Sequence, residues 1–321
     1  MPAPDPALVL RFRRGLAAPA GETAALAIAV SGGADSLALL LLAEAAFPGR
    51  ARAATVDHGL RAESEAEAAF VGAVCAARGI PHRTLKASVV PAGEGVQAAA
   101  REARYAALGA WMRDEGLPLL LTGHHADDQA ETLVMRLLRG SGVGGLAGIR
   151  TSAPFAAGGA GARLCRPLLA WRRAELEAIV REAGLEPVAD PSNRDEAYDR
   201  ARLRRLIEAA PWLDPAPLAR SAAALAEADQ ALEAMADRLF ARQAEIRDGT
   251  AALDPTDLPA ELLRRLVLRC LLAVDADASP RGEQITGLLA MLQAGRTATL
   301  AGISCRGGPR WHFAKAPPRR A

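Results

Sequence analysis

The first half of the chain alternates short apolar runs with longer segments in which apolar residues recur at helical spacing. The apolar runs predict strands, and the segments between them predict helices. The expected strands cover residues 24–30, 51–59, 81–88 and 118–123, and the expected helices cover 36–47, 62–79, 96–115 and 126–139. Strands that alternate with helices of these lengths indicate βαβ units, so we expect an α/β domain with a parallel sheet covered on both faces.

Two loose connections follow. Residues 140–149 hold five glycines, and we expect them to form neither regular helix nor strand. This segment is either a lid or substrate loop that orders on binding, or only a long connector. Residues 153–164 are expected to be a second loose connection.

The character of the chain changes beyond residue 211. Segments rich in Ala, Leu and Arg predict helices over 216–245, 258–273 and 281–294, and the tail predicts short strands around a Gly-Gly turn. The length of 321 residues also favours two domains over one. We therefore expect an α/β domain over residues 1–211 and a smaller, mainly helical domain over 212–321.

Composition and charge narrow the class of protein. There are 39 basic and 37 acidic residues, so the net charge of +2 neither requires nor excludes nucleic acid. No apolar run of about 18 residues is present and the start lacks a secretory pattern, so we expect a cytoplasmic protein without a membrane partner. The four cysteines form no C-x-x-C pair, which argues against a zinc ribbon or redox pair: Cys75, Cys165, Cys270 and Cys305.

The stretch SGGADS, residues 31–36, lies where the first strand hands over to a helix. A glycine-rich turn there allows backbone N–H groups and the helix dipole to hold a phosphate. The hydroxyls of Ser31 and Ser36 can donate to phosphate oxygens, whereas Asp35 would repel a bare phosphate and so indicates a divalent cation. The alternative is a tight turn with Ser and Asp capping the helix. A Walker A loop and a G-x-G-x-x-G fingerprint are both absent.

Further polar residues follow the second and fourth strands, on the same expected edge of the sheet. Asp57 and His58 end the second strand, and two histidines, two aspartates and a glutamate fall within residues 124–131. Acids at a helix start stabilise it by roughly 0.3–1 kcal/mol each, which accounts for one or two of them. It accounts less well for so many polar groups in eight residues.

These motifs together resemble a known family. SGGADS resembles the pyrophosphate loop of the N-type ATP pyrophosphatases, the PP-loop family. VDHGLR (56–61), LTGHHADDQAETLVMRLLRGSGVGGLAG (121–148), RPLL (166–169) and DPSN (190–193) follow in the order typical of its tRNA(Ile)-lysidine synthases. The resemblance covers roughly the first two-thirds of the chain, and its block around HHADDQAET is far more specific than the loop alone.

The resemblance implies a fold and a reaction. The fold would be Rossmann-like, of the adenine nucleotide alpha hydrolase type. The enzyme would use ATP and Mg²⁺ to join L-lysine to C2 of the wobble cytidine of tRNA(Ile) with a CAU anticodon. An adenylated cytidine would be the intermediate, and lysidine, AMP and pyrophosphate the products. The helical domain would bind tRNA, and a homodimer is left open.

The resemblance also implies roles for individual residues. It assigns catalysis to Asp35, Asp128, Glu131 and Arg104, and a metal site to Asp35 and Asp128. It assigns ATP binding to Ser31, Gly32, Gly33, Ala34, Asp35, Ser36, Asp57 and His58. It assigns lysine binding to Asp127, Asp128, Glu131 and Asn193, and RNA binding to Arg200, Arg202, Arg204 and Arg205.

Several of these positions have a simpler explanation. Arg104 could belong to a solvated helix face, Asn193 to an Asx turn, and the arginines of residues 200–205 to a solvated basic run. The family pattern R-N-x-x-R is also broken, because Ala201 replaces its asparagine.

Three rival functions remain open at this point. A tRNA thiolase could use the same loop but would need paired or cluster-binding cysteines. A metal-dependent phosphohydrolase could bind two metals and would leave SGGADS unexplained; its ligands would be Asp57, His58, His124, His125, Asp127 and Asp128. A catalytically silent nucleotide-binding module is the third.

Overall fold

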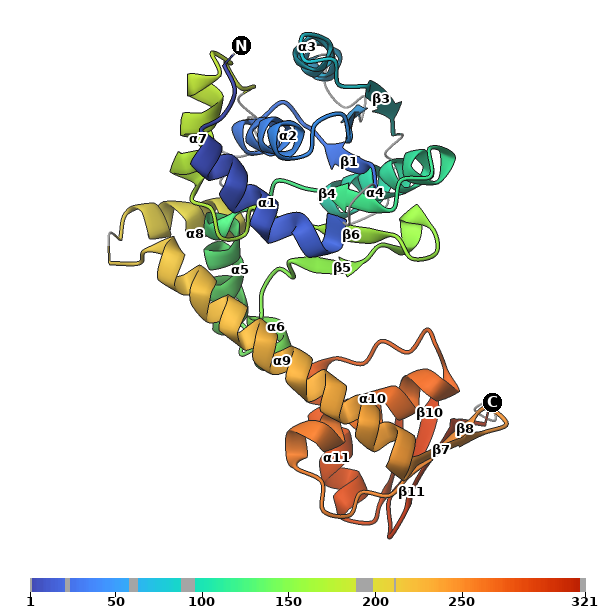
Figure 1. Ribbon diagram of the computed structural model, residues 1–321. Helices are drawn as coiled ribbons and strands as arrows, with labels where there is room; N and C mark the ends of the chain where they lie inside the picture. Colours follow the sequence, from blue (N-terminus) through green and yellow to red (C-terminus); the bar gives the residue numbers. More distant parts are fainter. Residues whose placement is uncertain are drawn as a thin grey trace. The chain divides into compact units, whose positions relative to one another are not determined.

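The computed structural model describes residues 2–20, 24–57, 63–87, 96–188, 199–210 and 212–317. The chain divides into two compact units, Met1–Ala226 and Glu227–Ala321. The division falls inside the long helix α9 (Pro215–Gln243), later than the boundary expected at residue 211. Figure 1 shows the course of the chain through both units.

The first unit is built on a six-stranded sheet of order β3-β2-β1-β4-β6-β5. Its strands are β1 (Leu26–Ala29), β2 (Ala51–Asp57), β3 (His82–Lys86), β4 (Leu119–Leu121), β5 (Ser152–Pro154) and β6 (Arg163–Cys165). All neighbouring pairs are parallel except β5 with β6. The predicted parallel sheet is therefore confirmed, but the expectation of a loose connection over 153–164 is wrong. Strand β6 pairs with the distant β4 and β5 pairs with β6, and the short, glycine-rich sequence between them does not reveal this pairing.

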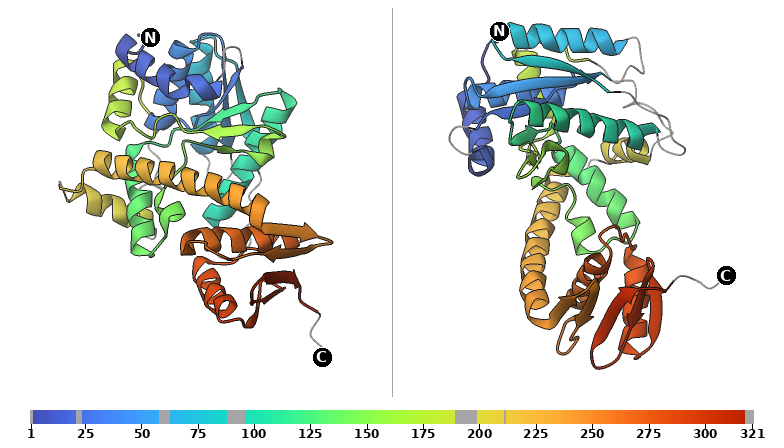
Figure 2. Two further views of the ribbon diagram at one scale, coloured as in Figure 1. Left: turned by 60° about the horizontal axis from the view of Figure 1, so that its bottom comes forward. Right: turned by 90° about the vertical axis from the view of Figure 1, so that its right-hand side faces the viewer.

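Helices cover both faces of this sheet, as Figure 2 shows. Their bounds are α1 (Pro6–Ala20), α2 (Ala34–Ala46), α3 (Glu63–Ala76), α4 (Val96–Asp114), α5 (Ala126–Leu138), α6 (Val143–Leu146), α7 (Arg173–Glu182) and α8 (Asp199–Glu208), with a 3₁₀ turn, η1 (Ala156–Gly158). Buried residues of α1, α2, α3 and α7 form one apolar cluster, and those of α4 form another. Helix α1 is not among the helices that the apolar pattern predicted.

The alternation along β1 explains how one strand serves two cores. Leu26 and Ile28 join the cluster of α2, whereas Ala27 joins the cluster of α4. Successive strand residues point to opposite faces, so a strand covered on both sides is apolar at every position.

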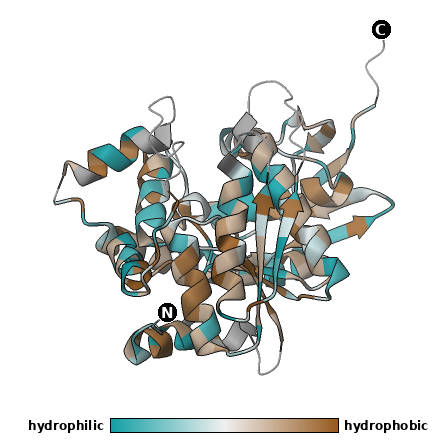
Figure 3. Cartoon of the chain, turned by 90° about the horizontal axis from the view of Figure 1, so that it is seen from above, coloured by the Kyte–Doolittle hydropathy of each residue, from teal (hydrophilic) through white to brown (hydrophobic). Residues whose placement is uncertain are grey.

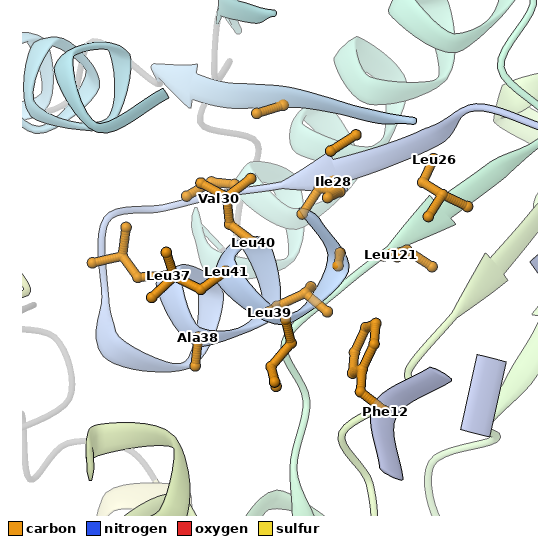
Figure 4. Close-up of a cluster of buried hydrophobic side chains, with 14 of the residues drawn as sticks. Phe12, Leu26, Ile28, Val30, Leu37, Ala38, Leu39, Leu40, Leu41 and Leu121 are labelled. Atoms are coloured by element: carbon orange, nitrogen blue, oxygen red, sulfur yellow. The ribbon is translucent and has the colours of Figure 1, made fainter. Parts of the chain in front are cut away.

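Helix α2 is almost wholly apolar and takes the hydrophobic colours of Figure 3. All six residues from Leu37 to Leu42 are fully buried. Figure 4 shows these side chains against Val30 and Ile28 of the first strand and its exit, with Phe12 of α1 nearby. Burying each leucine contributes roughly 1.5–3 kcal/mol, so the body of α2 is held firmly in place.

The glycine-rich segment 140–149 is more ordered than expected, because it contains the one-turn helix α6. Gln129 exchanges hydrogen bonds with the backbone of Ile149, accepting at 2.6 Å and donating at 3.2 Å. Arg136 donates to the carbonyl oxygens of Gly145 and Gly148 at 2.6 and 3.1 Å. The expectation that this segment holds no helix is therefore wrong, since side chains of α5 satisfy the backbone groups that glycines leave exposed.

The second unit combines helices with an antiparallel sheet of order β7-β8-β11-β10-β9. Its other elements are β7 (Ala244–Arg247), β8 (Thr250–Leu253), α10 (Ala260–Val274), α11 (Gly282–Gln293), β9 (Thr297–Leu300), β10 (Ile303–Arg306) and β11 (Trp311–Lys315). The predicted helices and tail strands are confirmed, and the sheet also takes in β7 and β8. In the described part of the chain, no helix is both long and apolar enough to span a bilayer.

Candidate active site

A cavity of about 1160 Å³ opens in the first unit where β1, β2 and β4 end. Parallel strands end at one edge of their sheet, and ligands of such sheets bind there. Of the residues singled out from the sequence outside the glycine loop, five line this cavity: Arg104, His124, Asp128, Arg204 and Arg205. The cavity therefore gathers side chains from α4, α5 and α8, which are far apart in the sequence.

The SGGADS loop forms one wall of the cavity, through Ser31 and residues 33–36. The Ser36 hydroxyl donates to the carbonyl oxygen of Gly33 at 2.9 Å and accepts from the backbone N–H of Ser31 at 3.1 Å. These bonds shape the turn into α2. Gly33 is the N-cap of α2 and supplies no side-chain cap, so the first N–H groups of the helix have no capping acceptor there. That is the arrangement that binds phosphate.

Gly32 lies behind this wall and needs to be glycine. Its φ of +89° falls in the left-handed region. A Cβ atom there would also meet Cγ2 of Val188 at 3.2 Å. Val188 donates its backbone N–H to the Gly32 carbonyl oxygen at 3.0 Å, so the segment after α7 braces the loop from outside. No motif pointed to Val188, because the contact joins residues distant in the chain.

Asp35 and Asp128 converge on one histidine. Nε2 of His125 lies 3.4 Å from Oδ2 of Asp35 and 3.6 Å from Oδ2 of Asp128. His125 is the N-cap of α5, and its backbone N–H donates to Asp128 at 3.0 Å. The sequence placed two acids at the start of this helix, but it did not reveal that His125 links Asp128 to Asp35.

The carboxylates around His125 raise the pKa of its ring. Burial, the largest effect, disfavours the charged ring, yet hydrogen bonds to Asp127 and Asp35 and the charges of Asp128 and Asp35 outweigh it. They raise the pKa of His125 to about 10. The ring is almost fully buried, so water screens its interaction with the carboxylates less than it would at the surface.

The residues fit a magnesium ion bound together with phosphates. Oδ1 of Asp35 is a buried oxygen with no hydrogen-bond partner, although its residue faces the cavity. A buried carboxylate oxygen without a partner is costly unless a ligand supplies one. Within the described ranges no three His, Cys, Asp or Glu side chains form a metal cluster. One or two carboxylates plus substrate phosphates is the arrangement typical of Mg²⁺.

Asp127 points away from the cavity, toward the start of α7. Its Oδ2 accepts the backbone N–H of Arg173 at 3.0 Å and lies 3.5 Å from Nε of Arg172. Burial alone would raise the pKa of Asp127, but the hydrogen bonds to His125 and Arg173 and the charges of His125 and Arg172 lower it to about 2. The structure thus separates Asp127 from Asp128, its neighbour in the sequence.

Glu131 is buried and is not among the residues that line the cavity. Its Oε1 accepts from Nε of Arg204 at 2.7 Å, and its Oε2 from Nη2 at 3.4 Å. This pair joins α5 to α8 and places Arg204 at the cavity wall. Such a pair is charge-assisted and fixes the planar guanidinium.

The remaining predicted residues fall into three groups. Asp57 ends β2 and Arg202 lies exposed on α8, and neither lines the cavity. Arg200 belongs to α8, but its side chain is not described. His58 and Asn193 lie outside the described residues.

Comparisons with known proteins agree with this geometry. A family model described as a PP-loop domain matches residues 10–210. The tRNA(Ile)-lysidine synthase of Novosphingobium aromaticivorans is 49% identical over 92% of this chain and 90% of its own length. That of Zymomonas mobilis is 44% identical over 92% and 89%. A solved U34-tRNA thiolase of Methanococcus maripaludis, with its [4Fe-4S] cluster, shares the fold. It has a TM-score of 0.55 at 17% identity, over 69% of this chain and 79% of that one.

Proposed function

This chain belongs to the tRNA(Ile)-lysidine synthases of the PP-loop family, and from that premise we propose how its residues carry out the reaction. The enzyme is an ATP-dependent ligase that forms lysidine on tRNA(Ile). We propose that the cavity of the first unit binds ATP with Mg²⁺, L-lysine and the wobble cytidine of a CAU anticodon. The cytoplasm, which supplies all of these, is its proposed location.

The observation that carries the proposal is the meeting of Asp35 and Asp128 beside the glycine loop. Asp35 lines the same cavity as the start of α2, and its buried Oδ1 has no hydrogen-bond partner. Both carboxylates are available to hold a magnesium ion, which would neutralise charge on the two outer phosphates. The N–H groups at the start of α2 would bind the same phosphates.

The first step is adenylation of the base. O2 of the cytidine attacks the α-phosphorus, a new P–O bond forms, and the bond to the oxygen bridging the α and β phosphates breaks. Pyrophosphate leaves with the electron pair of that bond. Arg104 of α4 lines the cavity and would offset charge on the transferring phosphoryl group. Asp57 ends β2 and would lie toward the nucleoside, and His58 is proposed with it.

The second step joins lysine to the activated base. The neutral ε-amine attacks C2, the C2–O2 bond breaks, and AMP departs with the oxygen while the amine loses a proton. A free lysine amine has a pKa near 10.4, so an acceptor for that proton is needed. Among the acidic residues assigned to lysine binding, Asp128 is the one that lines the cavity. Glu131 would bind the ammonium group once Arg204 moves aside, with Asp127 and Asn193 as further proposed contacts.

The RNA contacts are proposed for α8 and for the second unit. Arg205 lines the cavity and Arg202 is exposed on the same helix, so both can reach phosphates of an anticodon loop. Arg200 is proposed with them. Arg204 is held by Glu131 and would act mainly inside the cavity. The cytidine must leave its stack to reach the α-phosphate. The rest of the tRNA would therefore be bound by other surfaces of the protein.

The thiolase rival finds no support in the thiols. All four cysteines are free and buried, and none is among the residues lining the cavity. Burial raises the pKa of Cys75 to about 11 and of Cys270 to about 12, so these thiols are poor nucleophiles at neutral pH.

One assay tests the proposal. The purified protein is incubated with tRNA(Ile) carrying a CAU anticodon, ATP, Mg²⁺ and radiolabelled lysine, with tRNA(Met) as the matched control. Label should enter tRNA(Ile) only, and one AMP and one pyrophosphate should form per lysine. Label without ATP, or label in tRNA(Met) at the same rate, would contradict the proposed function.

A further inference from the structure

The chain leaving β4 passes very close to the first turn of α2. Gly123 lies just beyond the strand, and a Cβ atom there would sit 3.0 Å from the carbonyl oxygen of Asp35. It would also lie 3.1 Å from the carbonyl carbon of Asp35 and 3.2 Å from the amide nitrogen of Ser36. All three are backbone atoms, so rotation of a side chain cannot relieve the contact.

Neither side of this contact can retreat easily. The β4 exit is held from its other side, because Thr122 donates its N–H to the carbonyl oxygen of Cys165 at 3.1 Å. Ala126 likewise donates to the carbonyl oxygen of Trp171 at 2.9 Å. The body of α2 is anchored by its fully buried leucines. A methyl group at Gly123 would therefore displace the first turn of α2, where Asp35 lies.

The first turn of α2 also determines where one of the two carboxylates of the site lies relative to the other. Asp35 lies on α2 and Asp128 on α5, and both face Nε2 of His125, at 3.4 and 3.6 Å. Gly123 precedes His125 by two residues. The close approach of backbone at Gly123 thus sets how far α2 stands from the start of α5.

We propose that Gly123 is a positioning residue for the cation site, because its missing side chain sets the separation at which Asp35 and Asp128 serve one divalent cation bound with ATP. The inference rests on the proposed function, since it needs ATP and a cation at this place. Gly123 touches no substrate itself. Its effect is transmitted through the backbone of Asp35 and Ser36.

The test compares Gly123→Ala with Gly287→Ala. Gly287 lies in α11, and a Cβ atom there would meet nothing within 4 Å, so the control adds the same methyl group without strain. Binding of Mn²⁺ is measured by electron paramagnetic resonance with an ATP analogue carrying a methylene group between its α and β phosphates. Its affinity should fall about tenfold in Gly123→Ala, the scale typical of changes behind a metal ligand, and by less than twofold in Gly287→Ala.

Two further readouts separate positioning from general damage. The Mg²⁺ concentration at half-maximal lysine incorporation should rise by about the same factor in Gly123→Ala, whereas the affinity for tRNA should stay within twofold. If the variant is too unstable for these assays, the rise in melting temperature caused by Mn²⁺ and the analogue reads the same site.

Failure of the positioning role and failure of the proposed function give different results in these experiments. Unchanged Mn²⁺ affinity, or an unchanged melting shift, in Gly123→Ala overturns the positioning role. A wild-type protein that binds Mn²⁺ with the analogue but never incorporates lysine overturns the proposed function and leaves the positioning result to be judged on binding alone.

Discussion

Buried charge is paired differently at the cavity of the first unit and at the contact between α9 and α10 in the second unit. At the cavity of the first unit, Asp35 keeps a buried oxygen without a partner, and two carboxylates share one histidine. In the second unit, Arg265 is buried between α9 and α10, and Asp229 and Glu261 contact it at 2.7 and 2.9 Å. Glu233 contacts it as well. Unused bonding capacity marks a site that awaits a ligand, whereas fully matched charges mark a structural joint.

The largest effect is expected from a change at Asp35, the residue whose buried oxygen has no partner. Asp35→Asn should lower lysine incorporation about a thousandfold, since it removes a carboxylate proposed to hold the magnesium ion on the reacting phosphates. The melting temperature should change little, because the shape of the side chain is kept. Asp214→Asn is the control, since Asp214 is half exposed and pairs with Arg172 at the surface. Activity within tenfold of wild type in Asp35→Asn would remove Asp35 from the mechanism.

The second-largest effect is expected from the removal of Arg265, whose charge is matched by the acids around it. Arg265→Met leaves Asp229 buried without its counter-charge and should lower the free energy of unfolding of the second unit by about 3–5 kcal/mol. Urea denaturation followed by the fluorescence of the buried Trp311 measures this. Arg269→Met is the matched control in the same network. Arg269 is more exposed, so its loss should cost about 1 kcal/mol or less. Equal losses in both variants would show that burial does not set the difference.

A third variant tests whether the Glu131–Arg204 pair has a structural role, like the contacts of Arg265, or a role in binding lysine. Glu131→Gln weakens a hydrogen bond to a charged group and should raise the KM for lysine about tenfold, with pyrophosphate release in the absence of lysine unchanged. Glu182→Gln, an exposed acid of α7, is the control. If pyrophosphate release falls as far as lysine incorporation does, Glu131 serves the structure and not the amine.

The smallest effect concerns exposed charge. Arg202→Ala and Arg205→Ala should each weaken tRNA binding a few-fold and lower the slope of log affinity against log salt by about one. Filter binding at several salt concentrations measures both. An unchanged slope would assign these arginines to a solvated helix face.

The sequence alone predicted the parallel sheet because β1 and β2 are apolar runs separated by helical spacing. The pattern missed β5 and β6, since these short strands depend on pairing, of β6 with the distant β4 and of β5 with β6, more than on their own composition. It also treated residues 140–149 as unstructured, although Gln129 bonds the backbone of Ile149 and Arg136 that of Gly145. Glycine propensity describes an isolated segment, and here tertiary contacts override it.

What the sequence determined by itself is the chemistry available at the sheet edge: a glycine turn with Asp35, and a cluster of acids that begins α5. Local motifs carry that information because a turn and a helix start are specified by neighbouring residues. Only the tertiary structure decided which acids face the cavity. Asp128 faces it, Asp127 turns to α7, and Glu131 is held by Arg204. Adjacent helix residues point in directions about 100° apart, so packing, rather than sequence order, selects the side chains that meet the substrate.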